Sequence, residues 1–296
     1  MLRLVASLVA GMKLASLSTL AHDAAHNALT ASRALNKALS VLAFTPGLFN
    51  YRLWVYDHHV LHHPKANGPH ADSYRPLSLA QYQALSSWRR AWERFVRSPN
   101  PLAFGLYYIF QRWSLVKLLP SATLPAQVRR EAWRYAGLIG VYVAVLLVSL
   151  ACRADGNWLR FGLDVTLALV LPFFVFQSLM AWALYVNHTH PDVPWFDTEE
   201  RRVEVSNAAN ITVHVQLPRP VAALLHYFLE HPAHHVLPSI PCYRLWDAQI
   251  KLNELMGSRA IIVPASPKNL LATMRRCKLY DYEKQQWLDF DGKPTN

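Results

Sequence analysis

Cysteine is scarce in this chain, with three residues in 296, Cys152, Cys242 and Cys277. They stand far apart and form no CxxC pair, so the sequence indicates neither a disulfide framework nor a zinc knuckle. Internal repeats, a glycine-rich phosphate loop and low-complexity tracts are also absent. These absences argue against a disulfide-stabilised scaffold, a repeat architecture and a P-loop nucleotide site.

Charged residues are few as well. They make up 17% of the chain against 52% hydrophobic residues, and the 19 acidic residues are outnumbered by 30 Lys and Arg, which leaves a net charge of +11. A composition this apolar is unusual for a soluble enzyme and favours a membrane protein. The basic excess suits lipid headgroups or an acidic protein partner. Because no recognition module accompanies it, we expect no nucleic acid.

Two windows without any charge predict transmembrane helices. Residues 135–152 and 165–186 are both uncharged, and each is close to the ~20 residues that a helix needs to cross hydrocarbon. The short polar segment RADGNW between them predicts a tight hairpin whose two ends return to one side. Since the turn holds only Arg153 and Arg160, the positive-inside rule places it outside and the long flanking segments in the cytoplasm.

The N-terminal segment, residues 1–21, is apolar but carries Lys13 in its middle. A lysine at mid-bilayer costs roughly 3 kcal/mol on insertion scales. The segment spans the membrane if Lys13 snorkels or faces other helices, and a cleaved signal peptide is the competing interpretation. Residues 101–120 are apolar with spaced polar residues, which predicts a helix lying in the membrane interface.

The predicted fold class is all-α, an integral membrane helical bundle with a cytosolic helical cap. We expect a single domain over residues 1–296. Its parts are a possible span at 1–21, a cytosolic or interfacial segment at 22–132, a transmembrane hairpin at 133–186 and a cytosolic segment at 187–296.

All 14 histidines lie outside the two uncharged windows, and most of them form four groups. The groups are His22 and His26 in HDAAH; His58, His59, His62, His63 and His70; His188 and His190 in NHTHP; and His231, His234 and His235 in HPAHH. Residues three and four apart share one face of a helix, so each HxxxH or HxxHH motif directs its imidazoles together. One such motif arises easily by chance; three on one side of a membrane protein do not.

Imidazole is a common ligand of zinc, iron and copper. If residues 1–21 cross inward and the hairpin goes out and back, all four groups emerge on the same side. Eight or nine converging histidines exceed what one metal binds, so two metals are predicted. The predicted ligands are His22, His26, His59, His62, His63, His231, His234 and His235, with His188 as the ninth and His190 as its alternative. His58, His70, His214 and His226 are predicted not to bind metal; His58 is expected to orient a ligand or face solvent.

These motifs resemble the membrane fatty acid desaturases, a family with three histidine boxes. HDAAH is similar to the first box, HVLHH (residues 59–63) to the second and HPAHH to the third. NHTHP and HHVLPSIPCYRL resemble stretches of the acyl-lipid omega-6 type desaturases, and the resemblance covers about residues 20–245. Two differences stand out. Asn187 replaces the family glutamine before HTH. The family usually has four spans in all, two of them ahead of or around the first box, whereas only one candidate span precedes His22 here.

The resemblance implies a non-haem di-iron centre that uses O2 to introduce a double bond into a fatty acyl chain. It implies an integral membrane enzyme, in a bacterial inner membrane with the site facing the cytoplasm. The substrate would be carried on a lipid, CoA or a carrier protein, and an acidic donor such as ferredoxin or a cytochrome b5-like protein would supply electrons. Since no cytochrome b5-like domain is fused to the chain, we expect that donor to be a separate protein.

The histidines do not distinguish a desaturase from a hydroxylase or acetylenase, which stays as the alternative. A non-enzymatic metal-binding membrane protein is less favoured, because transporters carry ionisable residues within their spans. We expect carboxylates near the boxes to orient the ligand rings. The candidates are Asp23, Asp57, Asp192, Asp197 and Glu230. Aromatic candidates for lining an acyl slot are Trp54, Phe173, Phe174 and Trp182.

Overall fold

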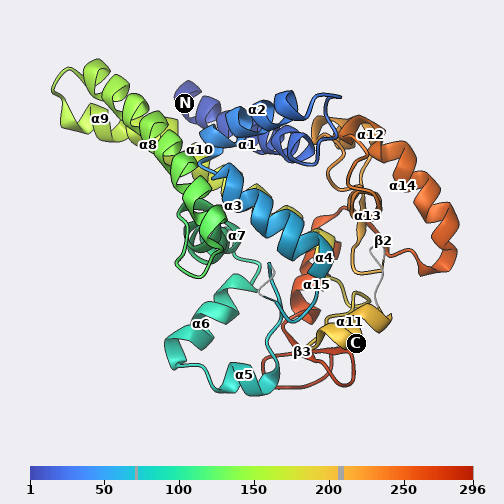
Figure 1. Ribbon diagram of the computed structural model, residues 1–296. Helices are drawn as coiled ribbons and strands as arrows, with labels where there is room; N and C mark the ends of the chain where they lie inside the picture. The colour runs from blue at the N-terminus through green and yellow to red at the C-terminus, as the bar shows by residue number, and fades with distance from the viewer. Residues whose placement is uncertain (71–72, 206–209, 296) are drawn as a thin grey trace. The chain divides into compact units, whose positions relative to one another are not determined.

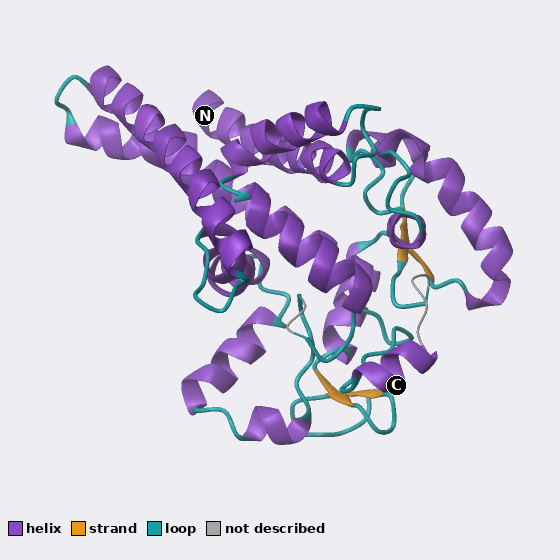
Figure 2. Cartoon of the chain, viewed as in Figure 1, coloured by secondary structure: helices purple, strands orange, loops and turns teal. Residues whose placement is uncertain are grey.

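The computed structural model describes residues 1–70, 73–205 and 210–295, and they are mostly helical, as predicted (Figure 2). The chain forms two compact units. The first unit comprises Met1–His58 and Phe104–Ala181, and the second comprises His59–Ala103 and Trp182–Asn296. In the described residues only four strands occur, each three residues long.

Three helices are long and apolar enough to cross a membrane: α1 (Leu2–Ala25), α8 (Ala126–Ala154) and the continuous run Trp158–His188. That run consists of α9 (Trp158–Val165), a π-helical turn η4 (Thr166–Val170) and α10 (Leu171–His188) (Figure 1). A left-handed residue, Asp155, ends α8, and Asn157 caps the next helix by accepting a hydrogen bond from the Arg160 amide. The predicted hairpin therefore forms.

Helix α1 runs in the same direction as the Trp158–His188 helix. Near its start, Arg3 forms an ion pair with Asp164. The Ser7 hydroxyl donates to the Leu167 carbonyl at 2.6 Å. One turn later Gly11 approaches residues further along the same partner helix. Within the first unit, α1 and the Trp158–His188 helix therefore pack against each other in parallel.

Close packing at Gly11 predicts a sharp difference between two glycine substitutions. A Cβ at Gly11 would lie 2.6 Å from the Val175 Cβ and 2.8 Å from the Pro172 carbonyl oxygen, whereas a Cβ at Gly137 in α8 meets nothing within 4 Å. We expect Gly11→Ala to destabilise the detergent-solubilised protein by about 1–3 kcal/mol. Gly137→Ala should not destabilise it, since alanine favours a helix. Equal thermal midpoints for the two variants would contradict this packing.

The first unit contains further helices around the first box and before the second. They are α2 (Arg33–Phe44), η1 (Thr45–Gly47), α3 (Tyr51–Val55), α7 (Ala103–Tyr107) and a π-helix, η3 (Tyr108–Leu118). Ser40 of α2 donates to the carbonyl of Ala21, next to His22, at 2.8 Å. The buried Asn50 side chain donates to the Ala132 carbonyl at 2.8 Å, which fixes the start of α3 against α8.

Residues 101–120 differ from the predicted interfacial helix. Arg112 and Lys117 are buried, at 6% and 4% exposure, and both form ion pairs with Asp57. The sequence pattern does not separate these outcomes, because an apolar segment with spaced cations looks the same whether its charges meet headgroups or a buried carboxylate.

The second unit holds the remaining elements. Its helices are α4 (His63–Lys65), α5 (Leu79–Gln83), α6 (Ser87–Val96), α11 (Glu199–Val205), α12 (Arg219–Leu224), α13 (His231–Val236), α14 (Cys242–Met256), η5 (Gly257–Arg259) and α15 (Pro267–Arg276). Strand β1 (His214–Gln216) pairs in parallel with β2 (Ile262–Pro264), and β3 (Leu279–Asp281) pairs antiparallel with β4 (Gln286–Leu288).

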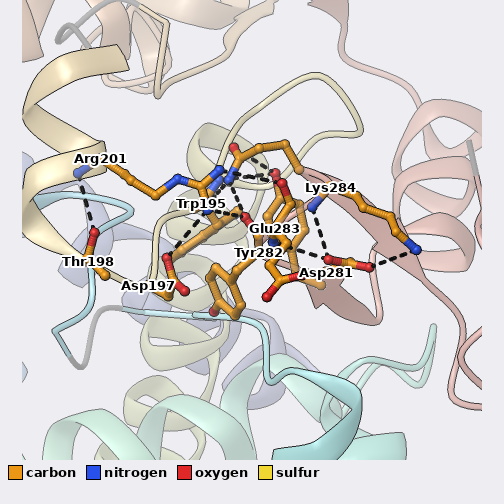
Figure 3. Close-up of polar contacts among 10 residues, drawn as sticks. Trp195, Asp197, Thr198, Arg201, Asp281, Tyr282, Glu283 and Lys284 are labelled. Carbon is orange, nitrogen blue, oxygen red and sulfur yellow. Dashed lines mark hydrogen bonds and ion pairs between the residues drawn. The ribbon is translucent and has the colours of Figure 1, made fainter.

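The C-terminal hairpin β3–β4 binds the segment that follows NHTHP. The Gln285 side chain donates to the Trp195 carbonyl at 2.9 Å, and Arg201 donates to the Tyr282 carbonyl at 3.0 Å (Figure 3). The Trp287 indole donates to the His190 carbonyl at 3.0 Å. Both tryptophans are fully buried. The tail thus fixes the chain just after the last long helix.

Candidate metal centre

The second box lies on a π-helical segment, η2 (Tyr56–His62), which follows α3 and leads into α4. A π-helix closes its hydrogen bonds five residues apart and therefore places one more residue in each turn than an α-helix. Residues four and five apart then take the place of the α-helical three-and-four spacing. This changes which histidines of HHVLHH share a face.

Four buried histidines of the second unit form one group: His62, His188, His231 and His235. Their ligand nitrogens all lie within 4.8 Å of one another. The His231 Nε2 lies 2.9 Å from the His188 Nε2 and 3.0 Å from the His235 Nε2. The residues come from η2, α10 and α13 and are at most 8% exposed. Nitrogen atoms aimed at one point from three elements form a donor set suited to a transition metal.

The protonation state of His235 also suits a metal. Burial, followed by the neighbouring imidazoles of His231, His63, His62 and His188, holds the pKa of His235 well below its ordinary value. Neutral imidazole is the form that binds metal ions, because the ring nitrogen must offer its lone pair. The four residues therefore fit an iron ion chemically, with the Nε2 atoms of three of them turned toward one another.

The other two histidines of the second and third boxes, His63 and His234, form a pair in the second unit. Their Nε2 atoms lie 3.1 Å apart, and His63 also lies beside His235, with ring centroids 4.5 Å apart. Adjacent histidines in each HH motif therefore face different partners: His62 and His235 join the four-histidine group, while His63 and His234 face each other.

The first unit contains a cluster of His22, His26 and His58. The ring of His58 lies 4.8 Å from that of His22 and 5.1 Å from that of His26, centroid to centroid. Trp54 stacks on His58 at 4.3 Å. His22 Nδ1 contacts the Asp23 carboxylate at 3.1 Å, the type of contact that orients a metal-binding imidazole.

His58 is buried, at 8% exposure, and joins this cluster, although the sequence favoured His59 and expected His58 to orient a ligand or face solvent. Within the described residues His59 belongs to neither histidine group. The π-helical winding explains the difference, because His58 is four residues before His62 and five before His63. No sequence signal distinguishes this winding from an α-helix.

His188 rather than His190 joins the four-histidine group.

Paired substitutions test the register of the second box. We expect His58→Ala to lower bound iron and product more than His59→Ala does, because His58 is a member of the three-histidine cluster. Iron per purified chain, by elemental analysis, is the measurement. The opposite result would show that His59 is the ligand and that the box is wound as an ordinary α-helix.

The histidines predicted not to bind metal lie outside both groups, except for His58. His190 Nδ1 lies 3.5 Å from the Asp192 carboxylate, and burial lowers its pKa. His70 lies 3.9 Å from Glu199. His214 lies 2.8 Å from Glu230, and His226 adopts a positive φ of 51°.

The carboxylates proposed from the sequence have different partners. Asp23 contacts His22, Asp192 contacts His190, and Glu230 contacts His214. Asp57 binds Arg112 and Lys117, and Asp197 lies 4.0 Å from Arg201. Of the five, Asp23 is the one whose contact is with a predicted metal ligand. The partners of Asp57 and Glu230 lie far along the chain, which is why the sequence did not indicate them.

Two of the four aromatic candidates line cavities. Trp182 lines an apolar cavity of about 300 Å³ in the second unit, together with Tyr185, Thr189 and Leu270. Phe173 lines one of about 290 Å³ in the first unit. Phe174 instead packs against Gly105, and Trp54 stacks on His58. The Trp182 cavity includes Thr189, the residue directly after His188.

Long apolar helices and buried histidine groups together define a helical membrane protein whose histidines could hold a metal ion. The chain belongs to the fatty acid desaturase family: residues 1–262 match the family model described as fatty acid desaturase.

The relatives that the chain resembles are acyl-lipid desaturases. It is 24% identical to the chloroplastic omega-6 fatty acid desaturase of Spinacia oleracea, over 92% of this chain and 58% of the relative. It is 25% identical to the sn-1 oleoyl-lipid 12-desaturase of Synechocystis sp., over 92% and 74%. It is also 25% identical to the sn-1 acyl-lipid omega-3 desaturase (ferredoxin) of Synechocystis sp., over 84% and 67%. The chain thus spans about three-fifths of the chloroplast relative.

Proposed function

We propose that this protein is a membrane-bound fatty acyl desaturase that uses O2 and two non-haem irons. The observation that carries the proposal is the four-histidine group, whose nitrogens converge within 4.8 Å in a chain of the desaturase family. We propose His62, His188, His231 and His235 as ligands of one iron. For the second iron, the histidine motifs of the sequence support the remaining box residues as ligands: His22, His26, His63 and His234, with His58.

The chemistry explains why a metal is needed. A methylene C–H bond has no acidity for a side-chain base to exploit, and iron held by these imidazoles would supply the activation of O2 that breaks it. The reaction balances when O2 accepts two hydrogens from adjacent methylenes, two electrons from a donor and two protons from solvent, and leaves as two waters. The chain's own residues orient the imidazoles and exclude water from the site.

We propose an acyl lipid as the substrate, supported by the names of the Synechocystis relatives, an oleoyl-lipid and an acyl-lipid desaturase. The apolar cavity beside Thr189 is proposed to hold part of the acyl chain. An acidic protein such as ferredoxin is the proposed electron donor, because the net charge of +11 would speed its encounter. We further propose a bacterial inner membrane, with the site facing the cytoplasm.

Expression in a host of known lipid profile tests the proposal. A new acyl chain lighter than its precursor by two hydrogens supports desaturation. One heavier by an oxygen atom identifies a hydroxylase instead, and a triple bond identifies an acetylenase. A host whose lipids stay unchanged, despite iron-loaded protein and a matching donor, would contradict the proposal.

A further inference from the structure

The third histidine box lies on a very short helix, and the structure shows what holds it. Helix α13 (His231–Val236) has six residues and no side-chain cap of its own. The two residues His226 and Tyr227, just before it, both have positive φ, 51° and 57°. A helix this short is not stable in isolation, and left-handed residues of this kind cost roughly 1–3 kcal/mol each. Its geometry must therefore be imposed by other parts of the unit.

Helix α14 reaches α13 through Gln249, and Asn253, one turn later on α14, holds Gln249. The Gln249 Oε1 accepts a hydrogen bond from the Ala233 amide at 2.9 Å and so caps the first turn of α13. The Gln249 Nε2 donates to the Asn253 Oδ1 at 2.8 Å. Gln249 is 2% exposed. A buried amide whose oxygen and nitrogen are both bonded has one defined orientation.

The chain of contacts continues through His214 to the residue before the box. The Asn253 Nδ2 lies 2.9 Å from the His214 Nδ1, and the His214 Nε2 lies 2.8 Å from the Glu230 Oε2. Because the backbone amide of Ala233 can only donate, every later role is fixed: Asn253 donates, His214 Nδ1 accepts, and the imidazole proton lies on Nε2, toward Glu230. His214 and Glu230 are 6% and 1% exposed.

We propose that Glu230, His214, Asn253 and Gln249, here called the box-three clamp, are positioning residues that fix the orientation of His231, His234 and His235. The clamp and residues 230–233 form a closed ring in which each donor meets an acceptor. It grips α13 at its capping residue, Glu230, and inside its first turn, at Ala233. Backbone pairing of β1 with β2 holds His214 itself, whose amide donates to the Ile261 carbonyl at 2.9 Å.

The inference about the clamp depends on the proposed function in one respect: it assumes that the third box binds metal. Replacing a residue that orients a metal ligand typically lowers metal affinity or activity by roughly 10–100-fold. We expect His214→Ala, Asn253→Ala and Gln249→Leu to release metal to excess chelator about 10–100-fold faster than the parent. Their kcat should fall while KM for the acyl substrate stays unchanged, because the clamp does not contact the acyl cavity.

The experiment uses the full-length protein in detergent, loaded with Fe(II) or with Co(II), whose absorption spectrum reports ligand geometry without turnover. Glu230→Gln keeps an oxygen acceptor for the His214 N–H and should hold metal nearly as the parent does, whereas Glu230→Leu should not. Lys251→Ala, in an exposed pair on α14 with Glu254, is the matched control and should behave as the parent.

Clamp variants that release metal at the parental rate, or that share the parental Co(II) spectrum, overturn the inference. If His214→Ala does not fold, Asn253→Ala answers the same question, because it removes the contacts of Asn253 with Gln249 and His214 and keeps the His214–Glu230 pair. If the parent binds metal and the clamp variants lose it faster, but the parent forms no altered lipid, the proposed reaction is wrong and the inference about the clamp stands. A parent that takes up neither metal overturns both.

Discussion

Replacing His62 with alanine should abolish formation of the new lipid. His62 supplies one of the four nitrogens of the buried histidine group and is 6% exposed. Removing a residue that only orients a ligand costs roughly 10–100-fold, and loss of a direct ligand should cost at least that. We therefore expect product to fall by more than about 100-fold. Bound iron should fall in parallel, as measured by elemental analysis of the purified chain.

His70→Ala provides the matched control, since it removes an imidazole from the same stretch of sequence. His70 is partly exposed and lies 3.9 Å from Glu199, in neither histidine group. It should retain parental iron and product. If His62→Ala gives the same lipid and the same iron content as the parent, the assignment of the four-histidine group is wrong.

Much of the fold follows from the distribution of charge along the sequence. The two uncharged windows predict the hairpin, and the structure has it as α8 and the Trp158–His188 helix. For residues 101–120 the sequence did not indicate that Arg112 and Lys117 are buried, because burial of a cation depends on its partner. Asp57 lies 55 residues before Arg112, and nothing local in either segment indicates the pairing.

The histidine groups also combine features that local spacing predicts with features that depend on tertiary packing. His22 with His26, and His231 with His235, stand four residues apart on one face of a helix, so spacing alone brings each pair together. The choice between His58 and His59 depends on whether the segment is wound as an α-helix or a π-helix. That winding depends on tertiary packing, which spacing does not encode. His214 and Asn253 lie 39 residues apart, and their contact is likewise invisible in the sequence.

Replacing Asp57 with alanine should destabilise the protein strongly. The carboxylate lies 3.1 Å from Arg112 and also pairs with Lys117, and all three side chains are less than a tenth exposed. Removing one partner of a buried ion pair costs about 3–5 kcal/mol, because the remaining charge stays buried without compensation. Here two cations would remain. Since natural proteins are stable by only about 5–15 kcal/mol, we expect a greatly lowered thermal midpoint in detergent.

Two further variants identify buried charge as the cause. Asp57→Leu combined with Arg112→Met and Lys117→Met should recover most of the lost stability, since apolar replacement of a whole buried ion cluster is often neutral or stabilising. Asp197→Ala, at the exposed pair with Arg201, should change stability by less than about 1 kcal/mol. A triple variant no more stable than Asp57→Ala would show that Asp57 acts through shape or hydrogen bonding and not through its charge. Recovery would instead show that the charges of this cluster join two π-helices, η2 and η3. The second histidine box lies on η2.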